Sequence, residues 1–428
     1  MKKVDRFTAL MLSVILAAAC TACNNQSSEV SNGESKSKSV SESKENKKSA
    51  ESSKEESASP EKDFFVIDME NGIGISYTGK DEEVVIPKEI NGKKVIKILT
   101  NSFRDNISLK KITIPDTVKS IDENAFSGCT ALENIIIPKS MVYISGEAFS
   151  GCKSLKSVTI SSDITYSYRE SSAFSDCPSI KEVTFTEGVT TIGDSFFRNC
   201  DNLSSVTIPN SVTTIGSGAF SGCKSLTSII IPDSVTTIGS GAFRECSSLT
   251  SITIPNSVTT IGDGAFSRCE SLTSITIPNS VTTIGNGVFS GTAWYNNQSD
   301  GLIYINKIAY EYKGDTVKNN SLKIEDGTSE IADCAFYSCK NLESITIPES
   351  VKKIGDNVFI YQEDHEVISQ FQDKKEKYIP RELTVYGKKG SYIESYAKEH
   401  NKKSGLIGYK ELDGGVHGGR YKINFVAK

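Results

Sequence analysis

Residues 203–223 read LSSVTIPNSVTTIGSGAFSGC, and the same pattern begins again at Leu226, Leu249 and Leu272. Apolar residues alternate at the start of this stretch and a proline follows them, which predicts a short strand with one buried face. The apolar residues after the proline, with two glycines between them, predict a return path with tight bends. The stretch therefore predicts one turn of a coil.

The repeat extends through most of the chain. Its phenylalanine recurs every 23 residues, apart from one gap of 25 and one of 47, at Phe103, Phe126, Phe149, Phe174, Phe197, Phe220, Phe243, Phe266, Phe289, Phe336 and Phe359. One turn buries about seven apolar side chains, worth roughly 1.5–3 kcal/mol each, whereas ordering its backbone costs about 1–2 kcal/mol per residue. A single turn is thus unstable, and stacked turns fold because each hydrophobic layer covers the next.

The repeated unit, Leu-x-x-Ile-x-Ile-Pro-x-x-Val-x-x-Ile-Gly-x-x-Ala-Phe-x-x-Cys, resembles the BspA-type leucine-rich-repeat surface proteins over roughly residues 63–400. We therefore predict a leucine-rich-repeat solenoid of the α/β class, mostly β and coil. It is a right-handed coil of 23-residue repeats, with a parallel β-sheet on one face and a cap at each end. The resemblance implies a cell-surface role in adhesion or binding, and it names no ligand.

The ends of the repeat region have the signals of caps. Asn71-Gly72 lies between two apolar stretches and predicts a β-hairpin, after which residues 84–87 supply the first strand of the stack. Residues 383–386 predict the last strand, and Ser391 with Glu394 forms a capping box that predicts a short helix. Residues 402–428 have little pattern, although 421–425 are compatible with one more strand.

The N-terminus carries export signals. Residues 1–19 contain basic residues followed by an apolar stretch too short to span a bilayer, as in a secretory signal peptide. The small residues before Cys20 resemble the lipobox of bacterial lipoproteins, with Cys23 as the alternative attachment site. Residues 20–62 are rich in Ser, Lys and Glu, and they predict a lipidated N-terminus and a disordered linker. The solenoid then occupies 63–381, and 382–428 form the C-terminal cap and tail.

Residue types that carry chemistry are placed in structural contexts. Eight of the nine cysteines in the folded part lie three places after the repeat phenylalanine, which predicts an inward ladder of small core residues. The three histidines stand apart from one another, so they form no metal-ligand pair. The glycine-rich residues 414–419 lack the strand-to-helix context of a phosphate-binding loop, and we interpret this segment as a flexible tail. We predict no enzyme, no cofactor and no metal site. A net charge of −5 argues against a protein that binds nucleic acid.

Two surfaces are candidates for partner binding. The first is a stripe at the exposed strand position, interrupted by Ile136 and Ile230, that consists of Thr113, Thr159, Thr184, Thr207, Thr253, Thr276 and Thr346. A solvated strand face explains such a stripe as well. The second is an irregular insertion at about 291–321 that predicts a hairpin and contains Trp294, Tyr295, Tyr310 and Tyr312. The alternative for these aromatic residues is that they fill the core of a variant turn.

The sequence thus predicts an exported, non-catalytic binding protein. It would be lipid-anchored to the cell membrane, exposed on the extracellular side, and would hold a host or neighbouring-cell surface protein or a glycan. A structural or scaffold protein of the cell's own envelope is the alternative. A carbohydrate-active enzyme that uses the insertion is a third, weaker interpretation.

Overall fold

A computed structural model describes residues 61–166, 172–314, 317, 320–337, 339, 341–362, 382–404, 410–412 and 416–428. The chain divides into two compact units, Met1–Glu55 and Glu56–Lys428, and the second holds all of these residues. The predicted signal peptide, Cys20, Cys23, His365 and the linker up to residue 60 lie outside the described residues.

The N-terminal cap is a β-hairpin. A short 3-10 helix, η1 (Glu61–Asp63), leads into β1 (Phe64–Met69), which pairs antiparallel with β2 (Gly72–Tyr77). The Asn71-Gly72 turn is therefore confirmed. A second, smaller hairpin follows, in which β4 (Glu89–Ile90) pairs antiparallel with β5 (Lys93–Ile98). β2 pairs in parallel with β5, so the cap continues directly into the repeats.

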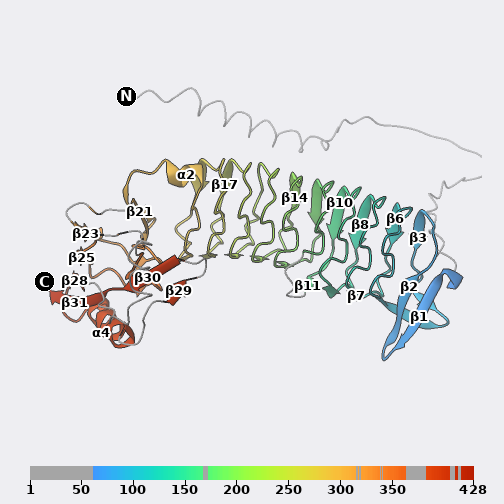
Figure 1. Cartoon of the computed structure of the whole chain (residues 1–428), viewed down its shortest axis with the longest axis horizontal. Helices are drawn as coiled ribbons and strands as arrows, with labels where there is room; N and C mark the ends of the chain where they lie inside the picture. Colours follow the sequence, from blue (N-terminus) through green and yellow to red (C-terminus); the bar gives the residue numbers. More distant parts are fainter. Residues whose placement is uncertain are drawn as a thin grey trace, which may run out of the picture. The chain divides into compact units, whose positions relative to one another are not determined.

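The strands at the position that precedes the proline of the repeat lie on one side of the coil, and we call this set the front sheet (Figure 1); the repeat that begins at Leu226 has no strand there. Its strands pair in parallel within four segments, and successive turns stay in register, as in Thr159↔Thr184↔Thr207. The predicted parallel sheet is thus confirmed. The segments are β3 (Glu83–Val85) with β6 (Lys111–Thr113); β8 (Asn134–Ile137), β10 (Ser157–Ile160), β12 (Glu182–Phe185) and β14 (Ser205–Thr207); β17 (Ser251–Thr253) with β19 (Ser274–Thr276); and β23 (Ser321–Lys323), β25 (Ser344–Thr346), β28 (Glu382–Gly387) and β31 (Lys422–Ala427).

A second parallel sheet, which the sequence did not reveal, follows the return path of each turn. We call it the rear sheet. Most of its strands are only two residues long, which is too short to show a periodic pattern, and half of these short strands are Thr-Ile. Its parallel strands are β2, β5, β7 (Ser120–Ile121), β9 (Tyr143–Ile144) and β11 (Thr165–Tyr166); β13 (Thr191–Ile192), β15 (Thr214–Ile215), β16 (Thr237–Ile238), β18 (Thr260–Ile261) and β20 (Thr283–Ile284); and β22 (Ile308–Lys313), β24 (Glu330–Ile331) and β26 (Lys353–Ile354). The strands β1 and β21 (Gly301–Ile305) join this sheet antiparallel, next to β2 and β22.

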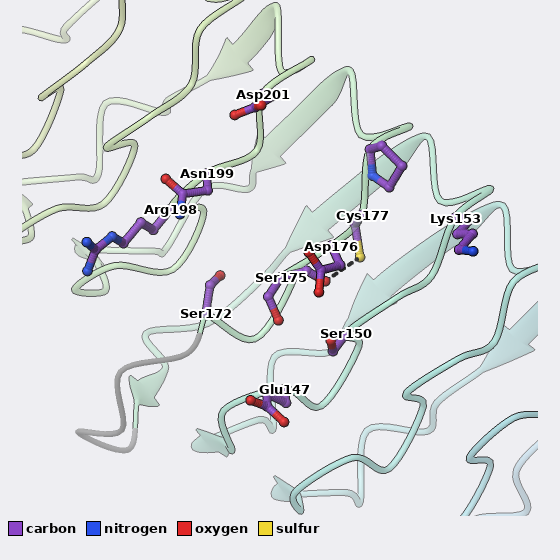
Figure 2. A pocket seen from close by; sticks show the side chains of 11 residues that line it. Glu147, Ser150, Lys153, Ser172, Ser175, Asp176, Cys177, Arg198, Asn199 and Asp201 are labelled. Atoms are coloured by element: carbon purple, nitrogen blue, oxygen red, sulfur yellow. Dashed lines mark hydrogen bonds between the residues drawn. The ribbon is translucent and has the colours of Figure 1, made fainter.

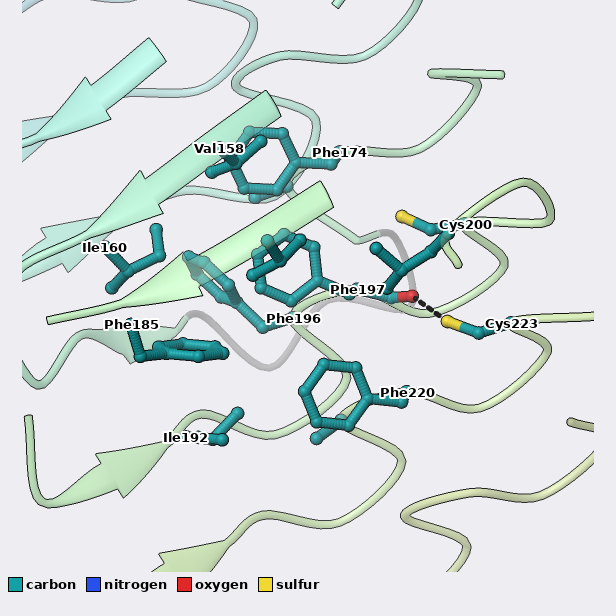
Figure 3. Packing of buried hydrophobic residues seen from close by; sticks show 14 of the residues in the cluster. Val158, Ile160, Phe174, Phe185, Ile192, Phe196, Phe197, Cys200, Phe220 and Cys223 are labelled. Atoms are coloured by element: carbon teal, nitrogen blue, oxygen red, sulfur yellow. Dashed lines mark hydrogen bonds between the residues drawn. The ribbon is translucent and has the colours of Figure 1, made fainter. Parts of the chain in front are cut away.

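The repeat phenylalanines stack inside the coil. From Phe103 to Phe289 each ring lies nearly parallel to the next, with centroids 4.8 to 6.1 Å apart. Figure 3 shows Phe174, Phe197 and Phe220 in this column. Offset stacking of this kind adds to the stabilisation from burial. The stacking of consecutive turns, predicted from the spacing alone, is confirmed.

The cysteines form a second buried column beside the rings. Eight of the nine described cysteines are buried. The Cys223 thiol donates to the carbonyl of Phe197 at 3.3 Å (Figure 3), and Cys246 and Cys269 make the equivalent bond one and two turns further on. Burial raises the pKa of Cys129 and of Cys223 to about 12. The predicted ladder of small core residues is therefore confirmed.

The C-terminal cap differs from the prediction in three respects. β28 is not the last strand, because β31 pairs in parallel beyond it, and Tyr421 beside β31 is buried; the further strand that the sequence allowed at 421–425 is therefore present. The helix α4 (Tyr392–Ser404) is present, but its capping box is incomplete: Glu394 accepts from the Gly390 N–H, while the buried Ser391 hydroxyl has no partner among the described residues.

The glycine-rich end is the third difference, because its residues 416–420 are not simply a tail. They form β30 (Val416–Arg420), which pairs with β27 (Ile360–Gln362) and β29 (Lys410–Leu412). The backbone pairing of a returning chain, not local pattern, decides this conformation. Among the described residues, no helix has the length and apolarity that a membrane span requires.

Candidate binding surfaces

The threonine stripe lies on the outer face of the front sheet. Thr207, Thr253 and Thr276 are exposed, and Thr113, Thr159, Thr184 and Thr346 are half-buried. The stripe keeps its register within each segment of the sheet, as in Thr253↔Thr276. The two interrupting residues also face outward, with Ile136 63% and Ile230 84% exposed. The structure thus aligns the predicted residues in a column within each segment of the front sheet and adds two apolar side chains to the same face.

Neighbouring positions widen the column over four turns. Exposed Ser and Thr side chains occupy the segments 204–207, 227–228, 250–253 and 273–276, and we call this area, with Ile230, the hydroxyl patch. Thr250 and Thr273 donate their hydroxyl protons to carbonyl groups of the preceding turn at 3.5 and 3.4 Å. Their oxygen atoms therefore keep lone pairs for a partner that donates hydrogen bonds.

The earlier turns of the same face are charged instead. Lys110 pairs with Glu82 at 2.7 Å, and Lys156 pairs with Glu133 at 2.9 Å, each across one turn. Exposed pairs of this kind contribute little stability. Their main consequence is that the front face differs in charge along its length: the earlier turns carry charged side chains, and the hydroxyl patch carries none.

The rear sheet carries a second set of threonines that the sequence analysis did not select. Thr191, Thr214, Thr237, Thr260 and Thr283 lie side by side in register over five successive turns. The preceding residue is also an exposed threonine in each of these turns. The repeated Val-Thr-Thr-Ile motif was the available signal. These residues provide a natural control surface for experiments on the front face.

The insertion contains a hairpin, as predicted, in which β21 pairs antiparallel with β22. A one-turn helix that was not predicted, α2 (Ala293–Asn296), precedes it and is capped by Thr292, whose hydroxyl accepts from the Tyr295 N–H at 3.0 Å. Tyr310 and Tyr312 are buried, so these two side chains fill the core of a variant turn and do not form a surface.

The other two aromatic residues are half-buried. Trp294 packs edge-on against Phe289, with centroids 5.0 Å apart. The Tyr295 hydroxyl donates to Glu311 Oε1 at 2.9 Å, and the second Glu311 oxygen is buried without a hydrogen-bond partner among the described residues. Burial raises the pKa of Glu311 above its ordinary value. The insertion is therefore mainly a packed joint between repeats.

A polar hollow of about 1050 Å³ lies beside the turns that include the 25-residue repeat (Figure 2). Its lining carries charges of both signs, such as Glu147, Lys153, Asp176 and Arg198. Cys177 also lines it, but its thiol donates to the Phe149 carbonyl at 3.0 Å. This backbone carbonyl is not a general base, so the contact does not activate the thiol as a nucleophile.

His400 has a structural role. His400 is buried, its Nε2–H donates to the Tyr421 carbonyl at 3.0 Å, and its ring stacks on Tyr396. In the described part of the chain no group of three His, Cys, Asp or Glu residues is arranged to hold a metal ion. The coil, its ring column and its repeated outer faces define a leucine-rich-repeat solenoid, a class of protein that presents extended surfaces.

The chain belongs to the BspA type leucine rich repeat family, whose sequence profile matches residues 82–203, 167–296 and 304–377 in 6 copies. Solved structures similar to it include a leucine rich cell surface protein from Faecalibacterium prausnitzii, with 28% identity, 76% of this chain and 99% of that chain covered, and a TM-score of 0.39. Another is a leucine-rich repeat protein from Bacteroides ovatus, with 25% identity, 69% of this chain and 78% of that chain covered, and a TM-score of 0.41. A comparison with curated proteins finds no match.

Proposed function

We propose that this chain is an extracellular, non-catalytic binding protein that holds a host or neighbouring-cell surface protein or glycan on the hydroxyl patch. The observation that carries the proposal is the register of the front sheet, which places the same uncharged hydroxyl groups on successive turns. Repeated contacts of this kind favour a repetitive partner, because each further contact is an intramolecular event. The family membership supports a binding or scaffold role.

The test uses the mature chain, made without residues 1–19 and with Cys20 and Cys23 changed to Ser. We would measure its binding to host cells, neighbouring bacteria and a glycan panel, and compare the variant Thr207→Lys/Thr253→Lys/Thr276→Lys. The matched control is Thr236→Lys/Thr259→Lys/Thr282→Lys, which changes three exposed threonines on the rear side.

The front variant is expected to lose binding, since bulky charges interrupt the patch at three turns, while the control retains it. Equal binding by both variants would contradict the proposal. Binding only to the producing cell's own wall would favour the envelope scaffold instead. Cleavage of a glycan at catalytic rates would support the carbohydrate-active enzyme.

The anchor is a separate proposal. We propose that a lipid on Cys20, or on Cys23, holds the protein at the membrane, because each thiol follows small residues at the end of the apolar stretch. Single Cys20→Ser and Cys23→Ser variants should differ in fatty-acid labelling, with one of them losing it. If both variants keep the label and the membrane association of the unmodified protein, the anchor is elsewhere.

A further inference from the structure

β1 is an edge strand at the N-terminal end of the rear sheet. Within the described part of the chain it pairs with β2 alone. The Thr78 N–H donates to the Asp63 carbonyl at 2.9 Å, which makes this a hydrogen-bonded pair of the antiparallel ladder. Such pairs alternate with non-bonded ones. The N–H and C=O groups of residues 64, 66 and 68 therefore point away from β2, toward the open edge.

The outer side chains of β1 are apolar. Phe65 is 61% and Ile67 45% exposed, although Phe64 on the opposite face is buried in the core. The devices that usually protect an edge, such as proline, a bulge or an uncompensated charge, are missing from β1. Its pairing with β2 has no bulge, and its one charged residue, Asp68, forms an ion pair with Lys93 at 2.6 Å. An exposed apolar edge of this kind is a template for another strand.

We propose that β1 is a self-association surface, and that its occupant is β1 of a second copy of this chain, antiparallel about a two-fold axis at Val66. In this register the outward backbone groups of residues 64, 66 and 68 meet those of 68, 66 and 64. Phe65 lies opposite Ile67 of the second copy, and Ile67 lies opposite Phe65. Aromatic and β-branched residues are a favourable cross-strand pair.

The charges beside β1 agree with the same register. Lys62 lies just before the strand and Glu70 just after it. An axis at Val66 brings Lys62 of each copy toward Glu70 of the other, so attraction occurs at both ends of the pair. A two-fold interface requires this self-complementarity. Axes at Phe65 or Ile67 leave more of β1 unpaired. The preceding segment 24–60 is rich in Lys, Glu and Asn, residue types that are depleted in strands, so it is the poorer occupant.

The experiment is sedimentation velocity of the mature chain with Cys20 and Cys23 changed to Ser, over a wide concentration range. The unmodified edge should give a reversible monomer–dimer equilibrium. Phe65→Lys/Ile67→Lys places lysine opposite lysine twice, and we expect the dimer to weaken about tenfold or more. Phe65→Glu/Ile67→Lys places glutamate opposite lysine in the proposed register, so its dimer should stay within a few-fold of the original.

Ile107→Lys is the control, because it changes an isoleucine that is 71% exposed elsewhere. It should leave the dimer unchanged. Circular dichroism checks that each variant is folded; if the double-lysine variant is not, Lys62→Glu, which opposes Glu70, should weaken the dimer instead.

Amide hydrogen exchange gives a second readout. The amides of Phe64, Val66 and Asp68 should become slower to exchange as concentration rises. A monomer at all concentrations would overturn the proposal, as would equal weakening by the two double variants. Concentration-independent protection would mean that the chain covers its own edge, which also overturns it. None of these outcomes bears on the hydroxyl patch, since β1 lies outside it.

Discussion

Replacement of Phe243 by alanine tests how strongly neighbouring turns depend on one another. The ring is fully buried and lies 5.7 Å from Phe220 and 5.4 Å from Phe266, stacked with both. Truncation of a buried Phe to Ala costs about 3–5 kcal/mol, and each stacked pair adds about 0.5–1.5 kcal/mol beyond area burial. Measured truncation costs already include lost ring contacts, and Phe243→Ala removes two stacked pairs, so we expect a loss at the upper end of that range, about 4–5 kcal/mol in the free energy of unfolding.

The assay is equilibrium unfolding in urea, followed by circular dichroism and by fluorescence of Trp294, the only tryptophan. Trp294 packs on Phe289, two turns beyond Phe243, so its fluorescence reports the loss only if the turns unfold together. Phe65→Ala, at an exposed phenylalanine, is the control and should cost under about 1 kcal/mol at concentrations where the chain is a monomer. Equal costs for the two variants, or an unchanged Trp294 transition in Phe243→Ala, would refute the reasoning.

Three further variants or conditions test individual parts of the structure. Glu311→Gln keeps an acceptor for Tyr295 but removes a buried charge. Because burial raises the pKa of Glu311 in the folded state, the variant should melt at a higher temperature than the original protein at pH ~7. This difference in melting temperature should vanish below pH ~4, where Glu311 is protonated in both the folded and the unfolded state. Burial raises the pKa of Cys223 to about 12, so the thiol of the folded protein should resist alkylation at neutral pH. The free energy of unfolding should fall as pH rises from ~9 toward 12, because only the thiol of the unfolded chain ionises readily in that range. Rapid alkylation of Cys223 in the native protein would contradict this prediction. Trp294→Ala should lower the free energy of unfolding by about 2–4 kcal/mol, less than the loss of a fully buried ring, because Trp294 is only half-buried. A cost below ~1 kcal/mol would mean that Trp294 does not hold the neighbouring repeats together.

The core was predictable because every layer repeats. Residues of one type that recur at a fixed spacing must lie in a column if the turns stack. The phenylalanines form one such column from Phe103 to Phe289, and the cysteines form another. The rear sheet was not predictable, since strands of two residues such as Thr214–Ile215 carry no periodicity. Pairing with the same two residues of the next turn creates these strands.

The candidate site was predictable only in part. The front-sheet threonines could be placed on an outer face by alternation, but the hydroxyl patch depends on which columns are neighbours, which required the register of the sheet. Aromatic content alone could not distinguish surface from core in the insertion. Tyr310 is buried because it lies at the end of the ring column, 5.9 Å from Phe289. The strand β31 was uncertain because it returns to the sheet from a distant part of the chain.

The central claim, that 23-residue turns lie on one another in register, is tested most directly by deleting one whole turn. Removal of residues 227–249 joins Leu226 to Thr250, which occupy successive positions of the repeat. We predict a folded protein with one cooperative urea transition and a modest loss of stability. Removal of 227–238 instead shortens the spacing from Phe220 to Phe243 from 23 positions to 11, too few to complete a turn, and should abolish that single transition. If both deletions have the same effect, whether tolerated or unfolded, the stacked-turn account is contradicted.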